Sequence, residues 1–141
     1  MQNIRELNLS HGRFGDKGLA MLKAMPHLER LQLVRTRTTD PAMTSLAEIK
    51  TLVSIKLDFT SITDKGVEAL KTLPKLQELT FDSLDITDQG ADILASMPNL
   101  KSVDLYHTLV SEKGYQKIKS ALPSCQIYWE RDSALPTRRH L

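Results

Sequence analysis

The sequence predicts an α/β solenoid, a curved right-handed horseshoe segment of five strand–helix repeats closed by a C-terminal capping strand. First, the segment from Leu52 (LVSIKLDFTSITDKGVEALKTLPK) aligns in register with the segment from Leu76 (LQELTFDSLDITDQGADILASMPN), and both are 24 residues long. Second, the same register begins at Ile4, Leu28 and Leu100. Third, a unit of this size cannot bury its apolar side alone, so neighbouring units must stack.

These repeats leave no room for a second domain. They occupy 4–27, 28–51, 52–75, 76–99 and 100–124, and 125–141 is predicted to be a cap and tail. The chain of 141 residues is 40% hydrophobic and 26% charged, which is the balance of a globular protein rather than a disordered one. We therefore expect a single domain over 1–141.

Each repeat is predicted to begin with a short strand. Counting places from the first residue of a repeat, apolar residues stand at places 1, 4 and 6, as in Leu52, Ile55 and Leu57. This is an anchoring leucine followed by the alternation of a strand with one buried side. Places 3, 5 and 7 then point away from the core. We call these places, with the adjoining place 8, the concave face.

A brief helix is predicted in the second half of each repeat, because apolar residues recur at a spacing of three, as in Val67, Leu70 and Leu73. In the second repeat, Asp40 before Pro41 is typical of an N-cap followed by the first helical residue. By repeat symmetry the same role is expected of Asp16, Asp64, Asp88 and Glu112.

Glycine and proline recur at fixed places in the predicted helices. Glycine stands just inside the helix at Gly18, Gly66, Gly90 and Gly114. It costs about 1 kcal/mol there relative to alanine, so we expect close packing between neighbouring repeats at this place. Proline ends the helix and favours an extended residue before the next strand, at Pro26, Pro74, Pro98 and Pro123.

The whole pattern resembles leucine-rich repeats. LxxLxL is followed by threonine at place 9 and isoleucine at place 11, as in Thr60 and Ile62. The ITDKG and ITDQG segments look like the bacterial subclass with T-x-[IV]-T-D-x-G units, which is similar to ribonuclease-inhibitor-like repeats. The resemblance covers residues 4–124 and departs from the pattern at Gly12, Thr38, Ala42, Lys50 and Leu84. It implies the solenoid fold and a module that offers its concave face to a partner.

The two ends of the solenoid are predicted to differ. CQIYWERD predicts a final strand whose Ile127 and Trp129 cover the last repeat as a cap. Nothing comparable precedes Ile4, so apolar residues of the first repeat, such as Leu7 and Phe14, are expected to be exposed. Three interpretations remain open: a missing upstream part of a longer chain, self-association through this end, and a frayed first repeat.

The concave face supplies the candidate binding residues. They are Arg30, Arg35, Lys56, Asp58, Phe59, Asp82, Asp104 and Tyr106. Basic residues gather in the first two repeats and acidic residues in the last three, which predicts a dipolar strip. Phe59 and Tyr106 are the first choices, because aromatic residues dominate binding hot spots. Alternatively, Phe59 folds back over its loop and Tyr106 is an isolated surface aromatic.

Other classes of function have weak support in the sequence. A net charge of +2 disfavours a nucleic-acid partner. The backbones of Asp58 and Asp82 are expected to lie about 5 Å apart on neighbouring strands, which is close to the separation of the two carboxylates in retaining glycosidases. An open sheet, however, does little to separate their pKa values, as an acid–base pair requires. The sequence has a single cysteine, Cys125, and no phosphate loop, nucleophile elbow or zinc motif. We expect no enzyme activity, no cofactor and no metal.

The predicted function is a non-enzymatic protein–protein interaction module that binds an unidentified protein or peptide on its concave parallel sheet. The sequence has no apolar run of signal-peptide or membrane-span length, so we expect no membrane partner and a cytoplasmic location. The alternative is a structural or self-associating element, or the C-terminal part of a larger repeat protein, acting through its uncapped N-terminal end.

Overall fold

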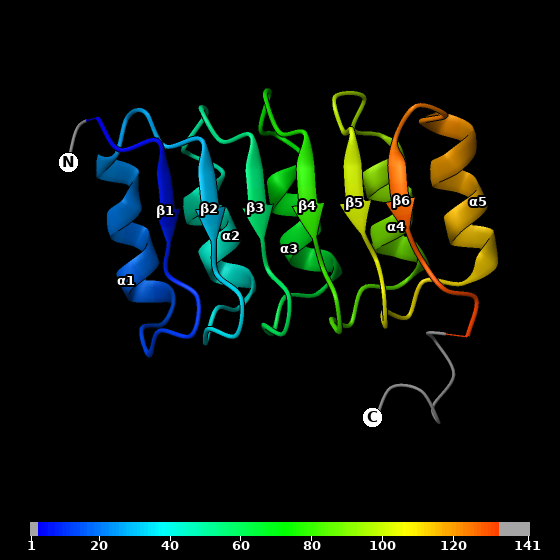
Figure 1. Ribbon diagram of the computed structural model, residues 1–141, viewed down its shortest axis with the longest axis horizontal. Coiled ribbons are helices and arrows are strands. Elements are labelled where there is room, and N and C mark those ends of the chain that lie inside the picture. The colour runs from blue at the N-terminus through cyan, green and yellow to red at the C-terminus, as the bar shows by residue number, and fades with distance from the viewer. Residues whose placement is uncertain (1–2, 133–141) are drawn as a thin grey trace.

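The computed structural model describes residues 3–132, in which six parallel strands lie side by side in chain order, with helices behind the sheet and beyond its two ends (Figure 1). The strands are β1 (Glu6–Asn8), β2 (Arg30–Gln32), β3 (Ser54–Lys56), β4 (Glu78–Thr80), β5 (Ser102–Asp104) and β6 (Gln126–Tyr128). The helices are α1 (Asp16–Ala20), the 3₁₀ turn η1 (Met21–Ala24), α2 (Asp40–Leu46), α3 (Asp64–Leu70), α4 (Asp88–Ala95) and α5 (Glu112–Ala121). The predicted tail lies outside the described residues from position 133 onward.

The strands pair in the register that the repeat predicts, and the place-4 residues of successive strands form one row. Leu31 opposes Ile55, which opposes Leu79. These three side chains are at most 1% exposed, so the row lies in the core between the sheet and the helices. The predicted strand–helix solenoid is confirmed.

The C-terminal capping strand is also present. β6 pairs in parallel with β5, and Ile127 and Trp129 pack against the buried core of the last repeat. The Trp129 indole stacks on Tyr115 of α5, with ring centroids 4.6 Å apart, and its Nε1 donates to the Val110 carbonyl at 2.9 Å. The cap is therefore fixed to both the last helix and the loop before it.

The predicted helix caps are wrong by one residue. The residue before each of these acidic residues is the N-cap: the hydroxyl of Thr87 accepts from Gln89 N at 3.2 Å, and that of Ser111 from Gly114 N at 3.4 Å. The acidic residue itself is the first helical residue, which suits the positive end of the helix.

The aspartates instead join consecutive repeats. The Asp64 carboxylate accepts the backbone N–H of Thr87 in the next repeat at 2.9 Å and also its hydroxyl. Asp88 binds Ser111 in the same two-pronged way, at 2.8 and 2.6 Å. The same contacts link Asp16 to Thr39 and Asp40 to Thr63. A ladder of carboxylates therefore ties each helix start to the next.

This ladder explains the glycines inside the helices. A β-carbon at Gly90 would lie 2.5 Å from Asp64 Oδ1, and one at Gly66 would lie 2.7 Å from Asp40 Oδ1. The expected close packing is confirmed, and the neighbour is the carboxylate of the preceding repeat. In the second repeat, where Ala42 replaces glycine, the Asp16–Thr39 contacts persist, so the carboxylate can yield to a methyl group.

We expect Gly90→Ala to lower the free energy of unfolding by about 1–2 kcal/mol, because strain against Asp64 and Ile86 exceeds the gain in helix propensity. Gly18→Ala is the matched control, since the nearest atom to its added β-carbon is Phe14 Cβ at 3.3 Å. That variant should be as stable as the wild type or more so in urea titrations. Equal effects at the two glycines would contradict the role of the ladder.

Departures from the repeat are absorbed locally. Buried Thr38, at the isoleucine place, lies 2.6 Å from the hydroxyl of Thr36, which in turn donates to the Leu33 carbonyl at 2.8 Å. In the first repeat, Gly12 makes room for Phe14, whose ring would meet a β-carbon there at 2.2 Å.

Candidate functional site

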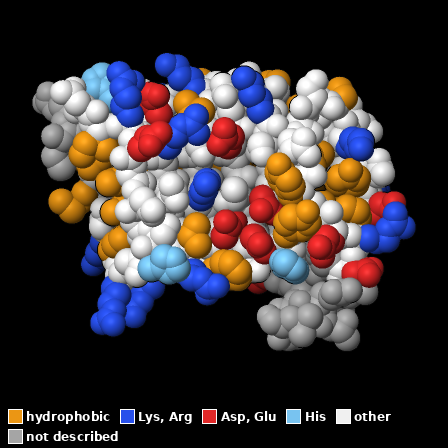
Figure 2. Space-filling view, viewed as in Figure 1, with side chains coloured by type: hydrophobic (Ala, Val, Ile, Leu, Met, Phe, Trp, Pro, Cys, Tyr) orange, Lys and Arg blue, Asp and Glu red, His pale blue; other side chains and the backbone are white. Residues whose placement is uncertain are grey.

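One side of the sheet carries no helix. In Figure 1, α2, α3 and α4 lie behind the strands, and α1 and α5 lie beyond the two ends of the sheet, so the concave face is turned to the viewer in Figures 1 and 2. Its rows follow the predicted register, with Gln32 beside Lys56, Lys56 beside Thr80, and Thr80 beside Asp104. Three of the predicted candidates, Arg30, Lys56 and Asp104, therefore lie on strands of a single sheet. The other five follow the ends of these strands: Arg35, Asp58, Phe59, Asp82 and Tyr106.

Place 8 of every repeat has a left-handed backbone. His11, Arg35, Phe59, Ser83 and His107 have φ values of 65°, 56°, 59°, 66° and 57°. Such a conformation costs a non-glycine residue about 1–2 kcal/mol. In the first four of these residues the N–H still pairs with the next repeat, as Phe59 N does with the Asp82 carbonyl at 3.0 Å. The sequence pattern did not reveal this turn, because none of the five residues is glycine.

The backbone ladder skips the N–H at place 7, and side chains of the concave face accept it instead. Asp58 Oδ1 accepts Asp82 N at 2.8 Å, and Asp104 Oδ1 accepts Tyr106 N at 2.9 Å. In the first two repeats Asn8 and Ser10 do the same for Ser10 N and Val34 N. Asp58 and Asp104 therefore have a structural role that the sequence analysis missed.

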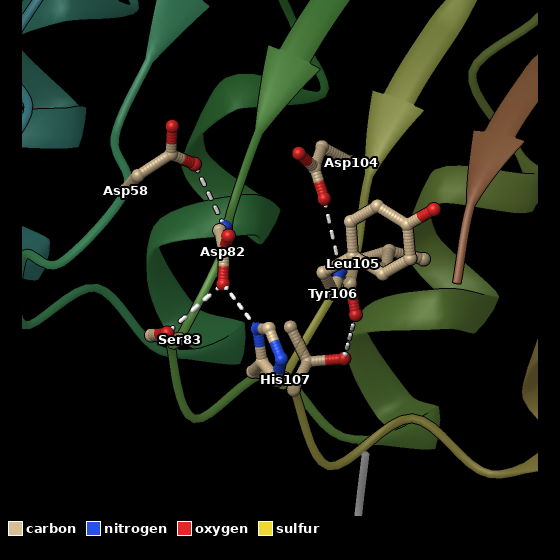
Figure 3. A network of polar contacts seen from close by, with 8 residues as sticks. Asp58, Asp82, Ser83, Asp104, Leu105, Tyr106 and His107 are labelled. Carbon is tan, nitrogen blue, oxygen red and sulfur yellow. Dashed lines mark hydrogen bonds and ion pairs between the residues drawn. The ribbon is translucent and has the colours of Figure 1, made fainter. Parts of the chain in front are cut away.

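Asp82 is the centre of a small polar network (Figure 3). Its Oδ1 lies 2.8 Å from His107 Nδ1 and accepts from the Ser83 hydroxyl at 2.9 Å. Its backbone N–H is held by Asp58. The Asp58 carboxylate thus binds the backbone N–H of Asp82, and the two residues are not joined as a facing pair of carboxyl groups.

Burial raises the pKa of Asp58 and of Asp104, although each accepts a backbone hydrogen bond that acts in the opposite direction. The neighbouring carboxylates raise both pKa values further, whereas Lys56 lowers that of Asp58 and His107 lowers that of Asp104. The three carboxylates therefore form a region of concentrated negative charge that only partly faces water.

Replacing Asp58 and Asp104 together with asparagine is expected to raise the free energy of unfolding at neutral pH. Folding raises the pKa of both carboxyl groups, so their ionised forms destabilise the folded state. The wild type therefore loses stability as the pH rises through the folded pKa values and regains it as the pH falls. Asparagine removes the charge and keeps an oxygen for the backbone N–H.

Urea titrations over a range of pH check this prediction. The advantage of the double variant should be largest near neutral pH, shrink as the pH falls, and vanish at about pH 3 and below, where both carboxyls are mostly protonated even in the unfolded chain. A double variant less stable than the wild type at neutral pH would mean that the carboxylates stabilise the fold.

The basic half of the predicted dipolar strip is largely engaged within the protein. Arg30 lies 3.3 Å from Glu78 and 3.7 Å from Glu6, reaching across the small, buried Ser54 between strands β2 and β4. The Arg35 guanidinium lies over the Phe59 ring, 4.1 Å from its centroid. Exposed Lys56 faces solvent near Asp58.

The aromatic residues gather at the acidic end of the face. The Tyr106 ring lies 6.2 Å from Tyr128 of β6 and 6.1 Å from His107. Tyr106 is therefore not an isolated surface aromatic. Tyr128 is 42% exposed and was absent from the predicted candidates, although alternation with Ile127 places it on the concave face. Phe59, 44% exposed, projects from its turn and supports Arg35.

The fold and the repeat together define a leucine-rich repeat solenoid of about five repeats with a C-terminal cap. The family model described as Leucine Rich repeat matches residues 1–23 and 49–71. No curated protein matches the sequence significantly. None of the helices within residues 3–132 is long and apolar enough to cross a membrane.

Solved structures share this architecture at low sequence identity. Actin-binding site 2 of leiomodin-1 is 18% identical with a TM-score of 0.68, over 87% of this chain and 81% of that one. An internalin from Listeria monocytogenes is 18% identical with a TM-score of 0.64, over 97% of this chain and 46% of that one. The chain in a TLR13–ssRNA13 complex is 25% identical with a TM-score of 0.65, over 90% of this chain and 19% of that one.

Proposed function

We propose that this protein is a non-enzymatic interaction module that binds a protein or peptide on its concave face. The contact residues of this proposal are Arg35, Lys56, Asp58, Phe59, Asp82, Asp104 and Tyr106, with Arg30 at the margin. Tyr128 joins them because its ring lies beside Tyr106.

The observation that carries this proposal is the exposure of aromatic side chains on a sheet face that no helix covers. Phe59 and Tyr128 are 44% and 42% exposed, and Tyr106 lies beside Tyr128. Large aromatic side chains bury much area at little cost in conformational entropy, so they anchor many protein interfaces. The actin-binding name of the leiomodin-1 structure offers a precedent on a similar fold.

Affinity capture from the native lysate tests the proposal with three baits. The first is the wild type, and the second carries Phe59→Ala, Asp82→Lys and Tyr106→Ala on the concave face. The third is a matched control with three exposed helix-side substitutions, Lys65→Ala, Glu68→Lys and Gln89→Ala. Mass spectrometry should find a protein that the wild type and the helix-side control retain and the concave variant loses. Identical captures by all three baits would refute the concave face as the binding surface.

The exposed apolar residues of the first repeat support self-association as a second candidate. Met21 is 76% exposed, and Leu7 and Phe14 are only half-buried although their counterparts Ile55 and Ile62 are fully buried. Met21→Glu should then lower the solution mass measured by light scattering at high concentration. A wild type that is monomeric over the whole concentration range would exclude this candidate.

We also propose the repeat subclass that the sequence predicts. The inter-repeat role of Thr63, Asp64 and Gly66 supports the subclass with T-x-I-T-D-x-G units, which is similar to ribonuclease-inhibitor-like repeats. The single-domain organisation with the stated repeat bounds and the cytoplasmic location stay predictions.

A further inference from the structure

The acidic end of the concave face combines charge and aromatic surface. We call Asp58, Asp82, Asp104, Tyr106 and Tyr128 the acidic–aromatic patch. Figure 2 shows one group of acidic side chains that extends from below the middle of this face toward the right, next to hydrophobic ones. The five residues come from three consecutive repeats and the capping strand, so a partner segment lying across the strands would meet them in succession.

The protein itself offsets only part of the negative charge of the patch, and the contact of Asp82 Oδ1 with His107 Nδ1 at 2.8 Å belongs to that part. Lys56 acts on Asp58 and His107 acts on Asp104, but in both cases burial has the larger effect on the pKa. Two guanidinium groups of the second repeat are directed elsewhere, Arg30 to Glu6 and Glu78 and Arg35 to Phe59. A positive charge brought by a partner would offset the repulsion among the three carboxylates.

The aromatic part of the patch suits the same kind of partner. Tyr106 and Tyr128 lie with ring centroids 6.2 Å apart and planes tilted by 51°. Arginine and lysine side chains pack their methylene stems and cationic heads against such rings. The protein already contains one contact of this kind, because the Arg35 guanidinium lies 4.1 Å from the Phe59 centroid.

We propose that the acidic–aromatic patch binds a cationic peptide segment, whose arginine or lysine side chains lie between the carboxylates and the tyrosine rings. This inference rests on the proposed function, since it names the chemistry of the partner on the same face. Acidic peptides are disfavoured by like charge, and nucleic acids are disfavoured because their phosphates would meet the three carboxylates.

Fluorescence polarisation with synthetic probes tests the inference. The probes are a fluorescein-labelled peptide of alternating arginine and serine, the same peptide with glutamate in place of arginine, and a single-stranded RNA of similar length. The wild type should bind the arginine peptide alone, and added salt should weaken the binding through screening.

Two double variants of equal charge change locate the binding. Asp58→Asn with Asp104→Asn retains an oxygen for each backbone N–H and should weaken binding of the arginine peptide at least about tenfold, which corresponds to about 1.4 kcal/mol. Glu48→Gln with Glu68→Gln removes two exposed carboxylates on the helix side and should change it by less than about twofold. Tyr106→Ser should also weaken it, and urea titration of each variant verifies folding.

The inference is wrong if the two double variants bind the arginine peptide equally, or if the glutamate peptide or the RNA binds as tightly. Its failure differs from failure of the proposed function. Suppose that capture of a protein depends on Phe59 and Tyr106 but is unaffected by Asp58→Asn with Asp104→Asn. The concave face would then remain the proposed binding surface, and the cationic partner would be refuted. If no substitution on the concave face changes which proteins are captured, the proposed function would be refuted.

Discussion

Phe81→Ala is expected to lower the free energy of unfolding by about 3–5 kcal/mol, a large part of the roughly 5–15 kcal/mol that holds a typical domain folded. Phe81 is fully buried and takes place 6 of the fourth repeat, where the adjacent repeats have Leu57 and Leu105. Truncation would leave a cavity at the middle of the stack, and both neighbouring repeats would lose packing. Urea unfolding followed by far-UV circular dichroism measures the loss.

Phe81→Leu is the matched control for this substitution. Leucine fills place 6 in the flanking repeats without exposure, so the variant should lose no more than about 1.5 kcal/mol. If alanine and leucine destabilise the protein equally, the aromatic ring is not what fills this part of the core.

Trp129→Ala is expected to cost about 2–4 kcal/mol, somewhat less than truncation of a fully buried tryptophan, because Trp129 is half-buried. The change removes the stacking on Tyr115 and the hydrogen bond to the Val110 carbonyl. Strand β6 would then be held mainly by its ladder to β5, which includes Leu105 N to the Tyr128 carbonyl at 2.7 Å. The last repeat should therefore open before the rest of the solenoid.

Hydrogen exchange measured by mass spectrometry distinguishes local from global loss after Trp129→Ala. Amides of residues 100–128 should exchange much faster, whereas amides of the second and third repeats should keep most of their protection. Tyr128→Ser, at the last residue of β6 and on the concave face, serves as the control and should leave exchange nearly unchanged. Similar exchange in the two variants would show that Trp129 does not close the end of the stack.

The repeat made the architecture predictable. Apolar residues at places 1, 4 and 6 determined which side of each strand is buried, and alternation after Cys125 identified the capping strand. The helix starts were predicted one residue late, because aspartate is a common N-cap and the sequence shows no sign that its carboxylate reaches the next repeat. That contact joins Asp64 to Thr87, which are 23 residues apart.

The candidate site was predictable as a surface but not as a set of interactions. The positions of Asp58, Asp82 and Tyr106 within their repeats placed all three on the concave face. The repeat did not show that Arg30 reaches Glu78 two strands away, because that contact depends on the small size of the intervening Ser54 and on the rotamer of a long side chain. Nor did it show the skipped N–H groups, which directly precede the left-handed residue at place 8.

Those skipped N–H groups limit how this surface can be redesigned or can diverge. The half-buried carboxylates of Asp58 and Asp104 accept the backbone N–H groups of Asp82 and Tyr106. Substitutions there are confined to side chains with a short oxygen acceptor, such as asparagine or serine, whereas Lys56 and Tyr128 can vary widely. New binding specificity on this scaffold should therefore arise first at positions such as Lys56 and Tyr128. The acceptor positions Asp58 and Asp104 should keep an oxygen acceptor.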